Sequence, residues 1–140
     1  MVKDTTQMLE ELKKCVSFTR FYHENADNLP NMTLADCLQE LLAQKGLKKA
    51  DVIRKSELSE TYAYQIFSGI RIPDRKKLFC LAIGMDLDLD QTQKLLKCSG
   101  YAPLYAKNPY DCVIIYGICK DYSIVDVNEL LYDYGMETLG

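Results

Sequence analysis

Apolar residues recur at intervals of three and four along most of the chain, with polar residues between them. This spacing is the signature of amphipathic helices. The pattern therefore predicts an all-α protein of about eight helices, without paired strands. We expect the helices over about residues 4–25, 34–46, 49–55, 60–67, 75–84, 89–99, 109–121 and 124–134.

Residues at the predicted helix starts can cap them. A side-chain oxygen of Ser, Thr, Asp or Asn at the N-cap accepts a hydrogen bond from a free backbone N–H of the first turn. We expect this role for Asp4, Thr33, Ser59, Asp74, Asp88, Asn108 and Ser123. Gly46, Gly69 and Gly100 are expected to end helices, and Pro73 prevents the helix before it from resuming.

The chain divides into three predicted parts. Residues 1–30 form an amphipathic N-terminal helix closed by a break at 28–31, residues 31–100 form a five-helix domain, and residues 101–140 form a linker and a C-terminal helical pair. The apolar stripe of the first helix either packs on the domain or pairs two chains. That stripe consists of Met8, Leu9, Leu12, Cys15 and Val16, with Phe18 and Phe21 as further candidates.

Residues 46–73 contain the most informative pattern. A short helix over 49–55, a polar turn over 56–59 and a second helix over 60–67 make a helix-turn-helix, whose second helix can lie in a DNA major groove. The apolar residues expected to face inward are Leu47, Val52, Ile53, Leu58, Ala63 and Ile66. The residues expected on the opposite face of the second helix, where they can reach base edges, are Glu60, Thr61, Tyr64 and Gln65. Gln65 could pair with adenine, and Glu60 could accept a hydrogen bond from cytosine.

Basic residues concentrate around this motif. Residues 45–85 carry nine Lys and Arg against four Asp and Glu, whereas 1–44 carry four against seven and 86–140 four against nine. Such a distribution is typical of a DNA-binding head within an acidic protein. The predicted phosphate contacts are Lys48, Lys49, Ser68, Arg71, Arg75 and Lys76. Arg75 and Lys76 open a helix, where cations oppose the helix dipole unless an anion such as a phosphate faces them.

The apolar segment LADCLQELLAQKGL, the turn after it and the exit from Gly69 to Pro73 together resemble the phage-repressor-like, or XRE (Cro/C1), helix-turn-helix family over about residues 33–85. The whole chain looks like bacterial helix-turn-helix proteins of similar length that are common in Firmicutes. The resemblance implies a repressor-like domain that binds DNA. Four positions depart from the family pattern. Lys49 stands in place of Gln, Ile53 stands where the family has a small residue, and Ala63 stands where it has Ile or Val. Glu57 replaces the turn glycine, so it must take an unusual φ or the turn must change.

The segment from residue 109 onward is rich in apolar and tyrosine residues. Helix 109–121 is apolar nearly all round, which predicts burial within the chain or between chains. Seven of the ten tyrosines lie from residue 101 onward, and tyrosine is favoured at interfaces. The pair is therefore either an oligomerisation or protein-partner element, or part of the monomer core. In the linker before it, Tyr101, Leu104 and Tyr105 are expected to anchor the chain.

Cysteine and histidine usage gives no metal-site pattern, because the six cysteines form no C-x-x-C pair and His23 is the single histidine. We expect free thiols, with Cys37, Cys80, Cys112 and Cys119 on buried apolar faces. Without a phosphate-binding glycine loop or a nucleophile elbow, we expect neither an enzyme nor a cofactor. No apolar run could span a membrane and the N-terminus lacks a signal-peptide core, which favours a cytoplasmic protein.

The sequence thus favours a sequence-specific double-stranded DNA-binding protein, a transcriptional regulator. It is expected to act as a homodimer, because one recognition helix reads few bases. The alternative is a protein-binding adaptor or antitoxin-like partner that keeps the fold with weak or no DNA binding. The net charge of −3, Glu57 and Glu60 in the motif, and the apolar C-terminal pair support that alternative.

Overall fold

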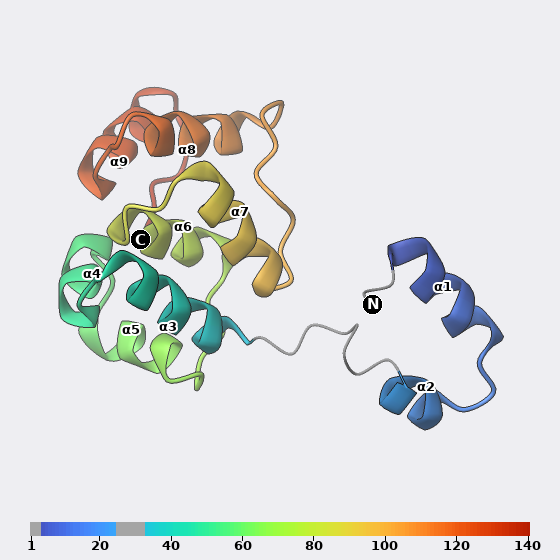
Figure 1. The fold of residues 1–140 in the computed structure, drawn as a ribbon. Helices are drawn as coiled ribbons and strands as arrows, with labels where there is room; N and C mark the ends of the chain where they lie inside the picture. The colour runs from blue at the N-terminus through green and yellow to red at the C-terminus, as the bar shows by residue number, and fades with distance from the viewer. Residues whose placement is uncertain (1–3, 25–32) are drawn as a thin grey trace. The chain divides into compact units, whose positions relative to one another are not determined.

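The computed structural model describes residues 4–24 and 33–140, without the side chains of Tyr22 and His23. In these residues every regular element is a helix, nine in all, and there is no strand (Figure 1). The all-α class predicted from the apolar spacing is therefore confirmed. The helices are α1 (Thr5–Lys14), α2 (Phe18–Glu24), α3 (Leu34–Lys45), α4 (Lys49–Ser56), α5 (Glu60–Phe67), α6 (Arg75–Gly84), α7 (Leu89–Cys98), α8 (Pro109–Cys119) and α9 (Ile124–Asp133). The break predicted at 28–31 and the side chain of His23 lie outside the described residues.

The prediction of one continuous helix over 4–25 is wrong, because α1 and α2 are separate helices. Cys15 follows α1 in an extended conformation, with ψ at 144°. The Ser17 hydroxyl then accepts a hydrogen bond of 3.3 Å from the Arg20 amide, which starts the next helix. A capping serine therefore interrupts the apolar stripe. By its contacts the chain forms two compact units, residues 1–31 and 32–140, and in the first unit Leu9, Leu12 and Val16 are exposed.

The predicted N-caps are confirmed, since each accepts a hydrogen bond from the backbone three residues later. The capping residues are Asp4, Thr33, Ser59, Asp74, Asp88, Asn108 and Ser123. In four of these caps the third helical residue also accepts a hydrogen bond from the cap's own N–H, which makes a full capping box. The helix boundaries in this chain are thus specified by local side-chain chemistry.

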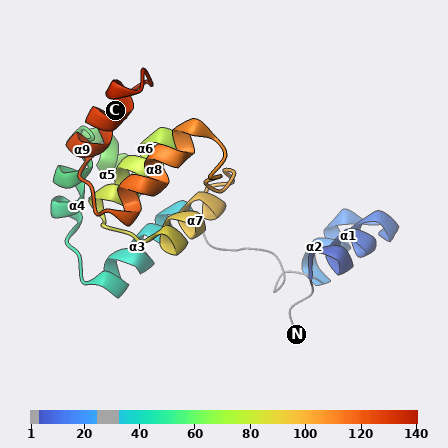
Figure 2. The ribbon, with the colours of Figure 1, turned by 90° about the horizontal axis from the view of Figure 1, so that it is seen from above.

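The core of residues 32–140 is centred on α6, whose Leu78, Phe79, Leu81 and Ala82 are almost completely buried. Helices α4, α7 and α9 all contact α6, and α3 contacts α5 and α7. Helix α8 contacts α7 and α9, and α9 also contacts α6, and both views show the C-terminal pair against the central helices (Figures 1 and 2). The C-terminal pair and the central helices therefore share one core.

Helix α8 is buried on one face only, which corrects the expectation that it is buried all round. Ile114, Gly117 and Ile118 face the core, whereas Cys112 and Cys119 are exposed. The prediction that these two cysteines lie on buried faces is therefore wrong, while Cys37 and Cys80 are buried as expected. One face of α8 belongs to the monomer core, and the other is available at the surface.

Arg75 fixes α8 and the preceding linker to the start of α6. Its Nη1 and Nη2 donate to the two carboxylate oxygens of Asp111 at 2.7 and 2.9 Å, and the same guanidinium donates to the carbonyls of Ala102 and Pro103. Asp111 also accepts from the Tyr105 amide at 3.0 Å. Arg75 thus pairs with an anion of the same chain, through two parallel charge-assisted hydrogen bonds, which are stronger than hydrogen bonds between neutral groups.

The linker is anchored mainly by Leu104 and Tyr101. Leu104 is buried, and its backbone N–H and C=O both bond to the Gln93 side-chain amide. The Tyr101 hydroxyl donates to the Pro73 carbonyl at 2.8 Å. The Tyr105 side chain, which we expected to act as a third anchor, is 60% exposed, and only its backbone takes part through Asp111.

The buried and exposed cysteines should differ sharply in reactivity. Burial, together with a hydrogen bond and the charge of Cys98, raises the pKa of Cys37 to about 12, and burial raises the pKa of Cys80 to about 11. Because the thiolate is the reactive form, iodoacetamide should label Cys112 and Cys119 in the folded protein and leave Cys37 and Cys80 unlabelled. Mass spectrometry after brief labelling measures this. In guanidinium all six should label, and equal rates for Cys37 and Cys112 in the folded state would contradict the structure.

Candidate nucleic-acid interface

Helices α4 and α5 are joined by a turn whose geometry is set by Ser56 and Glu57. The Ser56 hydroxyl is buried, donates to the Ile53 carbonyl at 2.7 Å and accepts from the Leu58 amide at 3.3 Å. Glu57 has a φ of 58°, in the left-handed region. Its backbone N–H donates a hydrogen bond to the Arg54 carbonyl, and α4 ends there. Of the two outcomes left open for Glu57, the positive φ is therefore the one adopted.

The position of α4 is fixed by a close approach to α6 at Gly84. A Cβ at Gly84 would lie 2.8 Å from the Val52 carbonyl oxygen and 2.9 Å from the Ser56 nitrogen, both backbone atoms of α4. Real Cβ atoms essentially never approach that closely. Glycine therefore allows the two backbones to touch, which holds α4, and the turn after it, at one distance from the core.

The buried and exposed faces of helices α4 and α5 follow the predicted spacing. Val52, Ile53, Ala63 and Ile66 are buried, with Leu47 and Leu58 half-buried against the same core. The predicted base-reading residues Glu60, Thr61 and Tyr64 are exposed, and Gln65 is half-buried. The surface of α5 thus presents three polar side chains within its first two turns.

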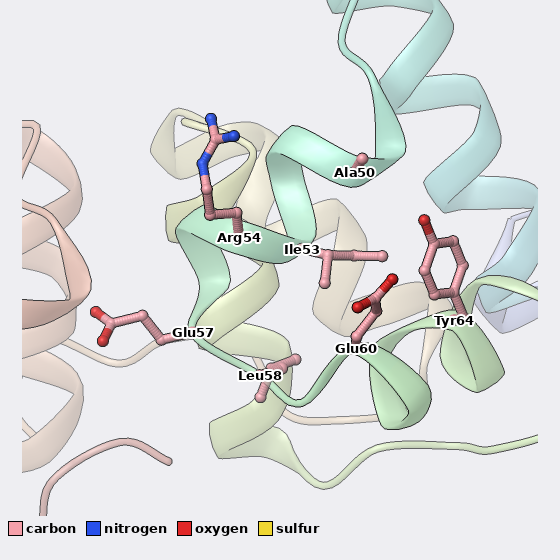
Figure 3. A pocket seen from close by; sticks show the side chains of 7 residues that line it. All are labelled: Ala50, Ile53, Arg54, Glu57, Leu58, Glu60 and Tyr64. Carbon is pink, nitrogen blue, oxygen red and sulfur yellow. The ribbon is translucent and has the colours of Figure 1, made fainter.

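A shallow depression of about 550 Å³ separates the outer faces of α4 and α5. Its lining residues are Ala50, Ile53, Arg54, Glu57, Leu58, Glu60 and Tyr64. Figure 3 shows Glu60 and Tyr64 extending from α5 into this space toward α4, while Arg54 and Glu57 point away from it. The carboxylate of Glu60 and the hydroxyl of Tyr64 therefore face the same side of the pair.

Gln65 and Arg71 are bonded to each other. The Arg71 Nε donates to the Gln65 Oε1 at 2.5 Å, and the guanidinium lies 5.6 Å from the ring centre of Tyr62. Burial, with the nearby charge of Asp74, raises the pKa of this Tyr62. Bidentate pairing of Gln65 with adenine needs both amide atoms, so in this arrangement its oxygen is already occupied by Arg71.

The remaining predicted phosphate contacts divide into two groups. Lys48, Lys49 and Ser68 lie at the ends of α4 and α5, with the Lys49 Nζ 5.4 Å from the Phe67 ring centre and the Ser68 hydroxyl donating to the Gln65 carbonyl. Within the described residues, no carboxylate lies within ion-pair distance of Lys48, Lys49 or Arg71. Among the described residues, the charges of these three cations are therefore not neutralised by a carboxylate, which leaves them able to pair with an outside anion.

Arg75 and Lys76 belong to the second group, whose positive charges pair with carboxylates of the same chain. Arg75 pairs with Asp111, and the Lys76 Nζ lies 2.7 Å from a Glu137 carboxylate oxygen and 5.3 Å from the Tyr110 ring centre. The anions that face these two cations at the start of α6 come from α8 and the C-terminal segment. We therefore leave both residues out of the proposed phosphate contacts.

Two residues that sequence reasoning passed over flank Arg71. Ile70 and Ile72 are 75% and 78% exposed in the segment between α5 and α6. The signal was present in the sequence, because a segment that follows a helix-ending glycine and precedes a proline has no helix face on which to bury branched apolar side chains. These side chains extend the surface of the pair beyond α5.

The described residues contain no helix that is long and apolar enough to cross a membrane. Nor do they bring three or more His, Cys, Asp or Glu side chains into an arrangement that could hold a metal ion. In comparisons with known proteins, no family model, no curated protein and no solved structure matches the chain.

Proposed function

We propose that the protein is a sequence-specific double-stranded DNA-binding protein and transcriptional regulator, with α3 to α7 forming a repressor-like helix-turn-helix domain. One observation carries the proposal: α5 exposes Glu60, Thr61 and Tyr64 directly after a tight turn. The cations Lys48 and Lys49 precede these residues in the chain and Arg71 follows them, and none of the three has a carboxylate partner within the described residues. Polar side chains on such a helix can contact base edges, and the flanking cations can neutralise phosphates.

The contacts divide into an anchoring and a reading set. Lys48, Lys49 and Arg71 anchor the phosphates, with the Ser68 hydroxyl as a further donor. The base contacts come from Glu60, Thr61 and Tyr64. Gln65 contacts a base only when Arg71 releases the Gln65 amide oxygen, or when the Gln65 and Arg71 side chains bind the base together. The proposed homodimer brings two copies of α5 one helical turn of DNA apart. The exposed apolar side chains of Leu9 and Leu12 on α1, and of Val16 after it, are the proposed contact between chains.

A titration across a salt series tests the proposal and separates its two sets. Lys49→Ala should weaken binding to all duplexes alike and reduce the slope of log affinity against log salt by about one unit. Thr61→Ala should cost about 1–3 kcal/mol on a duplex selected from a random library, and little on random duplexes, because base-edge contacts carry discrimination. Fluorescence anisotropy on both duplexes measures both effects.

Lys107→Ala is the control, because Lys107 is an exposed cation in the segment before α8, outside α4 and α5, so its loss should leave binding to both duplexes unchanged. Equal losses for Thr61→Ala on selected and random DNA would show that α5 is not the reading helix. If no duplex is selected and no variant changes binding, DNA recognition is wrong, and the adaptor alternative with its acidic Glu57 and Glu60 is favoured.

A further inference from the structure

The exposed side of the C-terminal pair carries an apolar groove of about 520 Å³. It is lined by Pro109, Cys112, Val113, Tyr116, Tyr122, Leu130, Tyr134 and Met136. The α8 residues among these span positions 109 to 116, which corresponds to roughly 10 Å, or two turns, of helix. The Tyr116 and Tyr122 rings meet edge to face at 5.7 Å on one wall. The groove therefore has the length and composition that suit one face of a short helix.

One rim of this groove is acidic. Asp126, Glu129 and Asp133 are spaced at i, i+3 and i+7 on α9, so they form one row beside the groove residues Leu130 and Tyr134. All three acids are exposed, and none forms an ion pair within the described residues. The rim therefore carries negative charge that the chain itself does not neutralise.

None of the eight lining residues is a cation, and Lys120, outside that set, is the cation in contact with one of their rings. The Lys120 Nζ is 5.7 Å from the Tyr116 ring centre, at the end of α8. A two-fold contact between copies would place the same acidic row on both sides of a partly desolvated interface, where like charges are costly. Charge complementarity therefore favours a basic occupant over a second copy.

We propose that this groove binds an amphipathic helix of another protein, with apolar side chains at i, i+3, i+4 and i+7 and with Lys or Arg beside them. The apolar side chains would fill the space between α8 and α9, and the basic residues would pair with the row Asp126, Glu129 and Asp133. The tyrosine hydroxyls along the edge supply hydrogen-bond partners at the rim. This inference is independent of DNA binding by α5.

Two synthetic helical peptides with the same leucine stripe, one flanked by Lys and one by Glu, test the proposal on the full chain. The Lys peptide should bind at least tenfold more tightly at low salt, and the difference should shrink as salt rises. Replacing Glu129 and Asp133 together by Lys should reverse the preference. Fluorescence anisotropy of labelled peptides measures both results.

Tyr134→Ala and Tyr132→Ala form a matched pair on α9. Tyr134 lines the groove, whereas Tyr132 is 77% exposed and is not among the groove residues. Because both are exposed, both variants should fold, and only Tyr134→Ala should weaken Lys-peptide binding, by about fivefold or more. Equal binding of the two peptides, or equal effects of the two variants, would overturn the proposal. So would a dimer in light scattering that Tyr134→Ala dissociates, because a second copy would then cover the groove.

Discussion

Replacing Asp111 by Ala should lower the free energy of unfolding by about 3 kcal/mol, within the range for breaking a buried ion pair. The Asp111 side chain is 4% exposed and that of Arg75 is 27% exposed. Without the carboxylate, the acceptors that the described part of the chain leaves to the guanidinium are the carbonyl oxygens of Ala102 and Pro103. The loss should also loosen the linker, because the Tyr105 amide loses its acceptor.

The contribution of the Arg75–Asp111 pair to the free energy of unfolding should decrease as the pH falls. Burial alone raises the pKa of Asp111, but the hydrogen bonds from Arg75 and the Tyr105 amide, with the charge of Arg75, outweigh it, so the pKa lies below its usual value of 3.8. The unfolded chain therefore takes up this proton before the folded chain as pH falls. The stabilisation is complete at neutral pH and is lost below about pH 4, as pH passes through the native pKa.

Urea unfolding of the unchanged protein, Asp111→Ala, Arg75→Ala and the double variant measures the coupling. The double variant should cost less than the two single variants together, because it leaves no unpaired buried charge. Glu137→Ala is the control, since its pair with Lys76 has a carboxylate side chain 82% exposed, and such pairs contribute about 0–1 kcal/mol. The central role of the Arg75–Asp111 pair would be contradicted if the double variant lost as much free energy of unfolding as the two single variants together. It would also be contradicted if Glu137→Ala lost as much as Asp111→Ala.

Features that depend on a few neighbouring residues were predictable from the sequence. Ser59 caps α5 by a bond to an amide three residues away, and Gly69 takes its positive φ directly after that helix. The outward position of Thr61 and Tyr64 follows from the helical repeat alone. The predicted face of α5 therefore needed no knowledge of tertiary contacts.

Features that depend on distant partners were not predictable in the same way. Arg75 and Asp111 are 36 positions apart, and no local pattern showed that this arginine turns toward α8 and away from the surface of α4 and α5. The apolar composition of α8 likewise indicated burial, but only the packing of α9 and α7 against it decides which side is covered. Cys112 is exposed for that reason, although its neighbours are as apolar as those of buried cysteines.

The closeness of α4 to α6 leads to the second large expected effect. Gly84→Ala should lower the free energy of unfolding by about 3 kcal/mol, the upper end of the usual range for overpacked cores. The added methyl group would meet the Val52 carbonyl oxygen at 2.8 Å and the Ser56 nitrogen at 2.9 Å. Both are backbone atoms, so α4 itself must move, and the gain in helix propensity of about 1 kcal/mol does not offset this.

Gly117→Ala is the matched control, because its Cβ would also meet an atom at 2.8 Å, but that atom is the Val127 Cγ2 methyl group. A side-chain methyl can shift where a backbone carbonyl cannot, so this variant should cost only about 1 kcal/mol. Thermal unfolding should therefore show a Tm shift about three times larger for Gly84→Ala. Because Ser56 and Glu57 form the turn before α5, amide chemical shifts from Ser56 to Thr61 should also change in Gly84→Ala and not in Gly117→Ala. Equal Tm shifts, or an unchanged turn in Gly84→Ala, would mean that α6 does not set the position of the α4–α5 surface.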